Sequence, residues 1–268
     1  MPYAKINKIN LYYETCGEGE PLAFLNGIFM STKSWSFQTP IFSKKYKVLL
    51  HDFRGQWQSD KPSGKYSLEL HVDDFQKLLM HLNVDKIHVV GTSYGGEVAM
   101  LFAIKYPEIV KSLTIISSVS EIHSALKLLG ERWLNAAKTR DPKIFITEWL
   151  ADVYSEEFLK NNWDFLWPRL NEAFKIFDFD AVIRLSESFL DLEKNPLTSE
   201  LKKIIAPTLI IAAELDKVKP IKYSKIIHDQ ISGSELYLIK ESGHVVVIEK
   251  AEKTNTIVLG FLEKLKLK

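Results

Sequence analysis

Hydrophobic and polar positions along the first 119 residues follow two alternating periods. Short apolar runs predict strands at residues 3–7, 10–15, 21–25, 46–53, 86–90 and 113–118. Helices are predicted from near Ser34, over residues 67–83 behind a Ser67 N-cap, and over residues 95–106, where Pro107 ends the helix. Strands that alternate with helices in this way predict a mostly parallel sheet with helices on both faces.

The pattern changes between about residues 121 and 197, where strand-like runs are absent and helical spacing prevails. This stretch holds four of the six tryptophans: Trp133, Trp149, Trp163 and Trp167. Alternation then resumes with a strand at 207–213, a helix at 221–231, a strand at 235–240 and a last helix at about 250–266. We therefore expect a core made of residues 1–119 and 199–268, with a helical cap or lid inserted at residues 120–198.

Composition narrows the classes of function. The chain has 268 residues, 46% of them apolar, and a net charge of +1, which gives no reason to expect nucleic acid or a membrane surface as a partner. Cys16 is the only cysteine, so neither a disulfide framework nor a thiolate metal site is expected. The first residues lack a signal-peptide pattern, and no apolar run approaches the roughly 20 residues that span a bilayer. We expect a cytoplasmic monomer or homodimer.

The segment Gly91-Thr92-Ser93-Tyr94-Gly95 matches the pattern G-x-S-x-G. The motif arises by chance in roughly one chain in ten of this length, so its context matters. Here an apolar strand leads into it and an apolar helix follows. In that context a sharp turn would hold Ser93 out as a nucleophile. The alternative is an ordinary glycine-lined turn with a capping serine.

A serine nucleophile needs a base, and the base needs an orienting acid. His244 follows the predicted strand 235–240, and Asp216 follows the predicted strand 207–213. Both lie at carboxyl ends of strands, where open α/β sheets bind ligands. Glu214 competes for the acid role, but we prefer Asp216 because Glu214 lies nearer the strand end. The other histidines form no metal-ligand pattern such as H-E-x-x-H, and neither a metal nor a cofactor is expected.

Acyl transfer also needs backbone N–H donors for the oxyanion. The turn after the third predicted strand contains Asn26-Gly27-Ile28, and Gly27 permits close approach to the site. We expect the Ile28 amide and the Tyr94 amide to be the two donors. An ordinary Asn-Gly turn is the alternative interpretation.

With these motifs the whole chain resembles the α/β-hydrolase family, most closely small capped bacterial esterases and enol-lactonase-like hydrolases. The loop from Asp52 to Pro62 is similar to the family's D-x-R-G-x-G-x-S-x-x-P pattern, and His244 to Glu252 is similar to its G-H-x-x-x-x-E-x-P-E ending. The resemblance implies an eight-stranded sheet with an antiparallel second strand, and a cap between strands six and seven. Asn26 stands where many members have histidine, and Trp57 replaces a usual glycine, which suggests a narrower pocket mouth.

These observations predict a serine carboxylic-ester hydrolase that acts on a small, largely hydrophobic ester. Relatives with an aspartate nucleophile, the haloalkane dehalogenases and epoxide hydrolases, are disfavoured by Ser93, and Ile28 disfavours the halide- and peroxide-using relatives. A lactonase or a carbon–carbon bond hydrolase with the same triad stays open, as does a slow-turnover ligand receptor. The cap offers four arginines that could serve an acidic substrate: Arg132, Arg140, Arg169 and Arg184.

Overall fold

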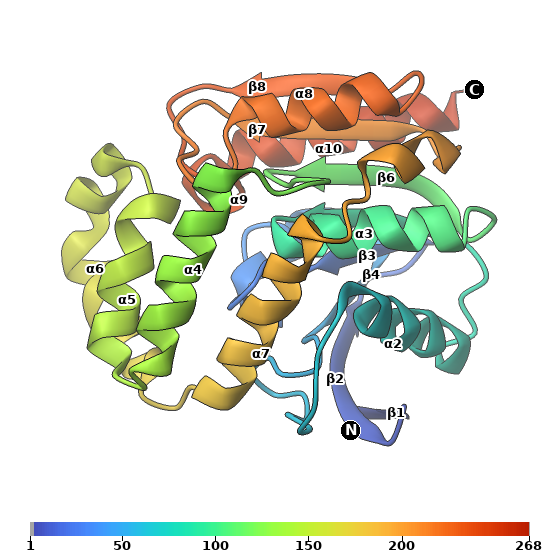
Figure 1. Ribbon diagram of the computed structural model, residues 1–268. Helices are drawn as coiled ribbons and strands as arrows, with labels where there is room; N and C mark the ends of the chain where they lie inside the picture. Colours follow the sequence, from blue (N-terminus) through green and yellow to red (C-terminus); the bar gives the residue numbers. More distant parts are fainter. Residues whose placement is uncertain (1–2, 268) are drawn as a thin grey trace.

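The computed structural model describes residues 3–267 and contains one eight-stranded sheet (Figure 1). Its strand order is β1-β2-β4-β3-β5-β6-β7-β8. Strand β2 runs antiparallel to both β1 and β4, and the other neighbouring strands are parallel, which confirms the predicted mostly parallel sheet. The strands are β1 (Tyr3–Ile6), β2 (Ile9–Cys16), β3 (Glu20–Leu25), β4 (Tyr46–His51), β5 (Ile87–Thr92), β6 (Val110–Ile116), β7 (Thr208–Ala213) and β8 (Glu235–Ile239).

Helices cover both faces of this sheet. Successive strand residues alternate between two hydrophobic cores, as Leu49 and Leu50 do on β4. One core includes residues of α2 (Leu68–His81), α3 (Tyr94–Lys105) and α8 (Ile221–Gln230). The other includes residues of α1 (Thr39–Phe42), α9 (Val246–Glu249) and α10 (Ala251–Lys266). The central parallel strands β5 and β7 are therefore buried along their whole length, as their nearly continuous apolar sequences require, whereas the edge strand β8 is partly exposed.

Four further helices come between β6 and β7, and we call them the cap helices. They are α4 (Ser124–Lys138), α5 (Pro142–Val153), α6 (Glu156–Phe174) and α7 (Phe179–Leu190). Figure 1 shows them grouped at one end of the sheet, with α6 farthest from it. Two short 3₁₀ turns, Asp191–Glu193 and Thr198–Lys203, lead the chain back to β7.

Local predictions from the sequence are confirmed to different degrees. Helix α2 begins behind Ser67, whose hydroxyl accepts a hydrogen bond from Leu70 N, and its apolar residues Val72, Phe75 and Leu79 are buried. Near Ser34, where a helix is predicted to begin, the helical structure is short. The structure has only a 3₁₀ turn at Thr32–Trp35 and the four-residue α1, because Pro40 lacks the N–H needed to continue a helix across this segment.

Within residues 3–267, none of the helices is both long enough and apolar enough to cross a lipid bilayer.

Gly95, in the first turn of α3, is the point where this helix meets the end of β3. A Cβ atom at this position would lie 2.2 Å from the carbonyl oxygen of Leu25 and 2.6 Å from that of Asn26. Both obstacles are backbone atoms, so they cannot swing aside. By contrast, a Cβ on Gly260 of α10 would meet no atom within 4 Å.

We predict opposite effects for two glycine-to-alanine variants. Gly95→Ala should lower the free energy of unfolding by at least about 2 kcal/mol, because the added methyl overpacks a backbone contact. Gly260→Ala should raise it by about 0.5–1 kcal/mol, because glycine is a poor helix former. Urea unfolding measures both, and equal effects would contradict the close approach at Gly95.

Two histidines are buried in the core, His51 on β4 and His71 on α2. Neither ring has a hydrogen-bond partner among the described residues for either nitrogen, and His51 stacks on Phe75 at 5.4 Å between ring centroids. Burial lowers the pKa of each imidazole from 6.5 to about 3. Both histidines are therefore neutral in the folded protein at pH 7.

These two histidines should make the fold acid-sensitive. Below about pH 6.5 the unfolded chain binds protons that the folded chain excludes, so stability falls as the pH drops from about 6.5 towards 3. Each histidine contributes at most about 1.4 kcal/mol per pH unit to the slope of the free energy of unfolding against pH. His71→Phe should make the fall between pH 7 and pH 5 shallower, whereas replacing the exposed His81 with Gln should leave it unchanged. Identical urea-unfolding profiles for wild type and His71→Phe would contradict this assignment.

Candidate active site

Ser93 lies at the sharp turn between β5 and α3. Its backbone has φ 52° and ψ −121°, a conformation that non-glycine residues rarely adopt. The turn is held from several sides: Ser93 N donates to Ile116 O at 2.9 Å, and Ser118 Oγ donates to Ser93 O at 2.8 Å. A strained residue kept in place by its surroundings is typical of a functional position. The predicted strand–turn–helix setting of Ser93 is present.

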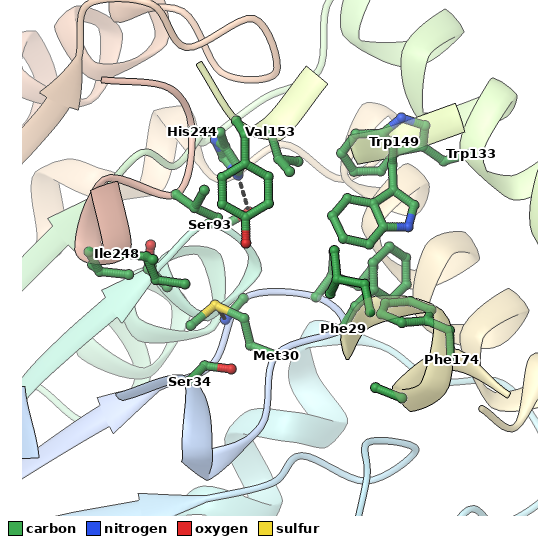
Figure 2. A pocket seen from close by; sticks show the side chains of 18 of the residues that line it. Phe29, Met30, Ser34, Ser93, Trp133, Trp149, Val153, Phe174, His244 and Ile248 are labelled. Carbon is green, nitrogen blue, oxygen red and sulfur yellow. Dashed lines mark hydrogen bonds between the residues drawn. The ribbon is translucent and has the colours of Figure 1, made fainter. Parts of the chain in front are cut away.

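Three side chains from distant loops meet at this turn. His244 Nε2 lies 2.9 Å from Ser93 Oγ, and His244 Nδ1 lies 2.8 Å from Asp216 Oδ2 (Figure 2 draws the first of these contacts). All three are buried, with exposed fractions of 9% for Ser93 and 5% for each of the others. The structure thus brings together the three residues that the sequence singled out, in the arrangement of nucleophile, base and orienting acid.

The Asp216 carboxylate is suited to orient a histidine. Burial by itself raises its pKa, but the His244 imidazole and the Lys219 N–H outweigh this effect, and the pKa lies below its ordinary value. Its other oxygen, Oδ1, accepts from Val218 N at 2.9 Å and Lys219 N at 2.7 Å. Glu214 instead accepts a hydrogen bond from Glu241 N at 3.0 Å and does not contact His244, so it shapes the loop.

The loop that follows β3 faces the same turn. A Cβ atom on Gly27 would lie 3.4 Å from Ser93 Cβ, which places the Gly27-Ile28 backbone directly beside the serine. Within residues 3–267 neither the Ile28 N–H nor the Tyr94 N–H donates a hydrogen bond to a protein acceptor. Two unengaged amides beside a nucleophile are what an oxyanion site requires.

Asn26 and Trp57, the two departures noted in the sequence, both brace this loop. Asn26 Nδ2 donates to His51 O at 3.1 Å, and its Oδ1 accepts from Trp35 Nε1 at 2.9 Å. Trp57 Nε1 donates to Phe29 O at 2.8 Å, at a residue whose own φ is 68°. The side-chain amide of Asn26 therefore provides hydrogen-bond partners for buried polar groups. The indole of Trp57 donates to the carbonyl of Phe29, whose backbone is strained.

A cavity of about 160 Å³ opens in front of Ser93 and His244. Figure 2 shows Phe29, Trp149 and Phe174 gathered on the side of the cavity away from the Ser93–His244 pair. The wall comes from the loop after β3, the loop from Asp52 to Pro62, the segment from His244 into α9, and the cap helices. It includes Met30, Trp57, Trp133, Trp149, Val153, Leu170, Phe174 and Ile248. Among residues 3–267, no lysine, arginine, aspartate or glutamate lines it, so it suits a neutral, apolar group.

Sequence reasoning missed a buried ion pair behind the site. Glu97 on α3 and Lys219 on the Asp216 loop pair with each other, with side chains 0% and 3% exposed. Burial raises the pKa of Glu97, while the Lys219 ammonium opposes the shift. A charged residue inside the otherwise apolar helix α3 was the available signal. The pair ties the helix that begins at Ser93 to the loop that holds Asp216.

Sequence reasoning also missed how closely the cap meets the His244 loop. Glu249 Oε1 accepts from Ser155 N at 2.9 Å, and Glu249 Oε2 accepts from Ser155 Oγ at 2.6 Å and Gly243 N at 3.1 Å. Val245 N donates to Val153 O at 3.3 Å. Bonds from the joint between α5 and α6 thus flank His244 on both sides, which couples the position of the cap to that of the imidazole.

The buried pair generates a stability prediction. Lys219→Met should lower the free energy of unfolding by about 3 kcal/mol, because it leaves the Glu97 carboxyl buried without its partner. A Glu97→Met/Lys219→Met double variant should recover most of the loss, since no unpaired charge is left. The matched control is Arg140→Met, which breaks the exposed Arg140–Asp180 pair and should cost less than about 1 kcal/mol. If chemical denaturation found equal losses in the free energy of unfolding for Lys219→Met and Arg140→Met, the proposed effect of burial would be contradicted.

Comparisons with known proteins agree with this architecture. A family model described as alpha/beta hydrolase fold matches residues 20–251. The chain is 24% identical over 260 residues to a putative carbamate hydrolase RutD of Pantoea ananatis, a match that covers 95% of this chain and 94% of the relative. It is 27% identical over 271 residues to the 2-hydroxy-6-oxononadienedioate/2-hydroxy-6-oxononatrienedioate hydrolase of Klebsiella pneumoniae, with 96% and 92% covered.

A solved structure is also similar over nearly its full length. The α/β-hydrolase enzyme MGS-M2, from a Medee basin deep-sea metagenome library, has a TM-score of 0.92 and 31% identity, with 97% of each chain covered. The family model alone spans well over half of the sequence, and the sheet order and helical insertion described above fit it. The chain belongs to the α/β-hydrolase fold family.

Proposed function

We propose that this hydrolase cleaves a carboxylic ester of a small, largely hydrophobic substrate through an acyl-enzyme on Ser93. The observation that carries the proposal is the hydrogen-bonded series Ser93–His244–Asp216 at the floor of an apolar cavity. A buried serine in contact with an imidazole, itself oriented by an ionised carboxylate, is the arrangement that makes a hydroxyl nucleophilic.

In the proposed mechanism His244 Nε2 accepts the proton of Ser93 Oγ as the oxygen attacks the ester carbonyl carbon. The Ile28 and Tyr94 amides donate to the resulting oxyanion. His244 then gives its proton to the leaving alcohol as the carbon–oxygen bond breaks. A water molecule, deprotonated by the same imidazole, attacks the acyl-serine, and the acid leaves as Ser93 regains a proton. Asp216 stays ionised throughout and holds the Nδ1–H tautomer.

We further propose that residues 120–198 act as a cap that supplies most of the aromatic wall. Trp133, Trp149 and Phe174 come from three different cap helices and line one cavity with Ser93. A substrate enclosed there would be shielded from bulk water, which strengthens the hydrogen bonds that stabilise the transition state.

A neutral substrate is favoured over a dicarboxylate. The name of the Klebsiella relative specifies a dianionic substrate, which would need positive side chains in its pocket. None of the four cap arginines lines the cavity here: Arg132, Arg140, Arg169 and Arg184. The absence of these arginines from the cavity wall supports an ester or a lactone as the substrate, over the alternative of a carbon–carbon bond hydrolase. The other alternative, a slow-turnover receptor, would be distinguished from an enzyme by a measurement of rapid multiple turnover.

The test is hydrolysis of p-nitrophenyl acetate together with labelling by a fluorophosphonate probe. Ser93→Ala should lower kcat by at least about 1000-fold and abolish labelling, and Asp216→Asn should lower kcat by a similar order. Ser224→Ala is the matched control, because this buried serine lies on α8, away from the site. Wild-type rates or undiminished labelling in Ser93→Ala would remove the proposed nucleophile.

A further inference from the structure

A second, much smaller hollow also borders Ser93. It has a volume of about 20 Å³ and lies between the Ser93 turn, the cap helices α4 and α7, and the Asp216 loop. Since one water-sized group needs about 10–15 Å³ measured in this way, the hollow holds only one or two non-hydrogen atoms. The large cavity, at about 160 Å³, is eight times bigger.

Three residues border both spaces: Ser93, Ile28 and Trp133. The Trp133 ring is held in place by its Nε1, which donates to Asp152 Oδ2 at 2.8 Å. The reacting serine therefore stands where the two spaces meet, and the fixed indole forms part of the wall of each. An ester bound at Ser93 can place one of its two arms in each space.

The position of His244 indicates which arm of the ester, alcohol or acyl, lies in which of the two spaces. The imidazole lines the large cavity but not the hollow, whereas Tyr94, one of the two proposed oxyanion donors, lines the hollow but not the large cavity, and Ile28, the other donor, borders both. The leaving oxygen must lie within reach of His244 Nε2, because that nitrogen delivers its proton. The alcohol therefore belongs in the large cavity. The carbonyl oxygen faces the Ile28 and Tyr94 amides, and the acyl chain, on the far side of the carbonyl carbon from the alcohol, points past these amides into the hollow.

The cap helices α4 and α7 pack closely beside the hollow. A Cβ on Gly130 of α4 would lie 2.9 Å from Leu190 Cδ2 and 3.2 Å from Phe189 Cε1 on α7. The wall of the hollow is mainly apolar, with Leu129, Trp133 and Phe189, and Lys219, the one cation that borders it among residues 3–267, is paired with Glu97. A short, uncharged acyl group fits these limits.

We propose that the substrates are esters that join an acetyl-sized acyl group to a larger apolar alcohol. This inference rests on the proposed serine mechanism and adds to it the orientation of the substrate. It makes Leu129 and Phe189 residues that determine acyl-chain specificity.

The experiment measures kcat/KM for p-nitrophenyl acetate, butyrate and hexanoate, which share one alcohol and differ only in acyl length. Wild type should prefer acetate over hexanoate by at least about 30-fold, a typical limit set by pocket size. Leu129→Ala should reduce that preference to less than about 5-fold by raising the rate for hexanoate. Leu129 is half-buried, so its truncation should leave the fold intact. Phe189→Val is the second variant and should act in the same direction.

The matched control is Phe174→Ala, which enlarges only the large cavity. It should leave the acetate-to-hexanoate ratio unchanged while altering kcat/KM across acetates of increasingly large alcohols, from methyl to naphthyl acetate. A wild-type preference for hexanoate, or a ratio that moves in Phe174→Ala but not in Leu129→Ala, would overturn the orientation. Fluorophosphonate labelling of Ser93 separates this failure from failure of the mechanism, since labelling persists if only the orientation is wrong.

Discussion

The site depends on one constraint, the positive φ of Ser93 between β5 and α3. An L-residue adopts this conformation only if its neighbours impose it. Here Ser93 N donates to Ile116 O at the end of β6, and Ser93 O accepts from Ser118 Oγ just beyond this strand, so both backbone polar groups of Ser93 are held. The glycines around it let α3 approach the end of β3 to distances that no Cβ would permit. The packing of the sheet and of α3 thus offsets the backbone strain at Ser93. As a result the Ser93 side chain is held at the end of β5.

Buried charges connect the parts of the site that the chain supplies separately. Asp216 holds the imidazole of His244, and Lys219, three residues later, pairs with Glu97 on the helix that begins at Ser93. In a low-dielectric interior each of these charges would be costly alone, and each is offset by a partner from another segment. The helix that begins at Ser93 and the loop that holds Asp216 are therefore held together by electrostatic interactions as well as by packing.

The cap helices line the cavity and also hold the backbone beside His244. Glu249 bonds the joint between α5 and α6 to the residue before His244, and a Cβ on Gly243 would lie 2.6 Å from Ser155 N. A displacement of the cap would thus disturb the backbone that carries the imidazole. The same helices divide the space around Ser93 into two unequal parts, which is the basis for assigning the two arms of an ester.

The sequence by itself determined the alternation of strands and helices, the turn at Ser93 and the residues Asp216 and His244, because apolar periodicity and glycine spacing are local signals. It predicted the start of a helix near Ser34, where the structure has only a 3₁₀ turn and the four-residue α1, since Pro40 interrupts the segment. Only the tertiary structure decided that Trp133, Phe189 and Lys219 share one small hollow, and that Glu97 and Glu249 are paired with distant groups. Contacts between residues far apart in the chain leave no periodic pattern, so packing alone sets the size of each cavity and the partner of each buried charge.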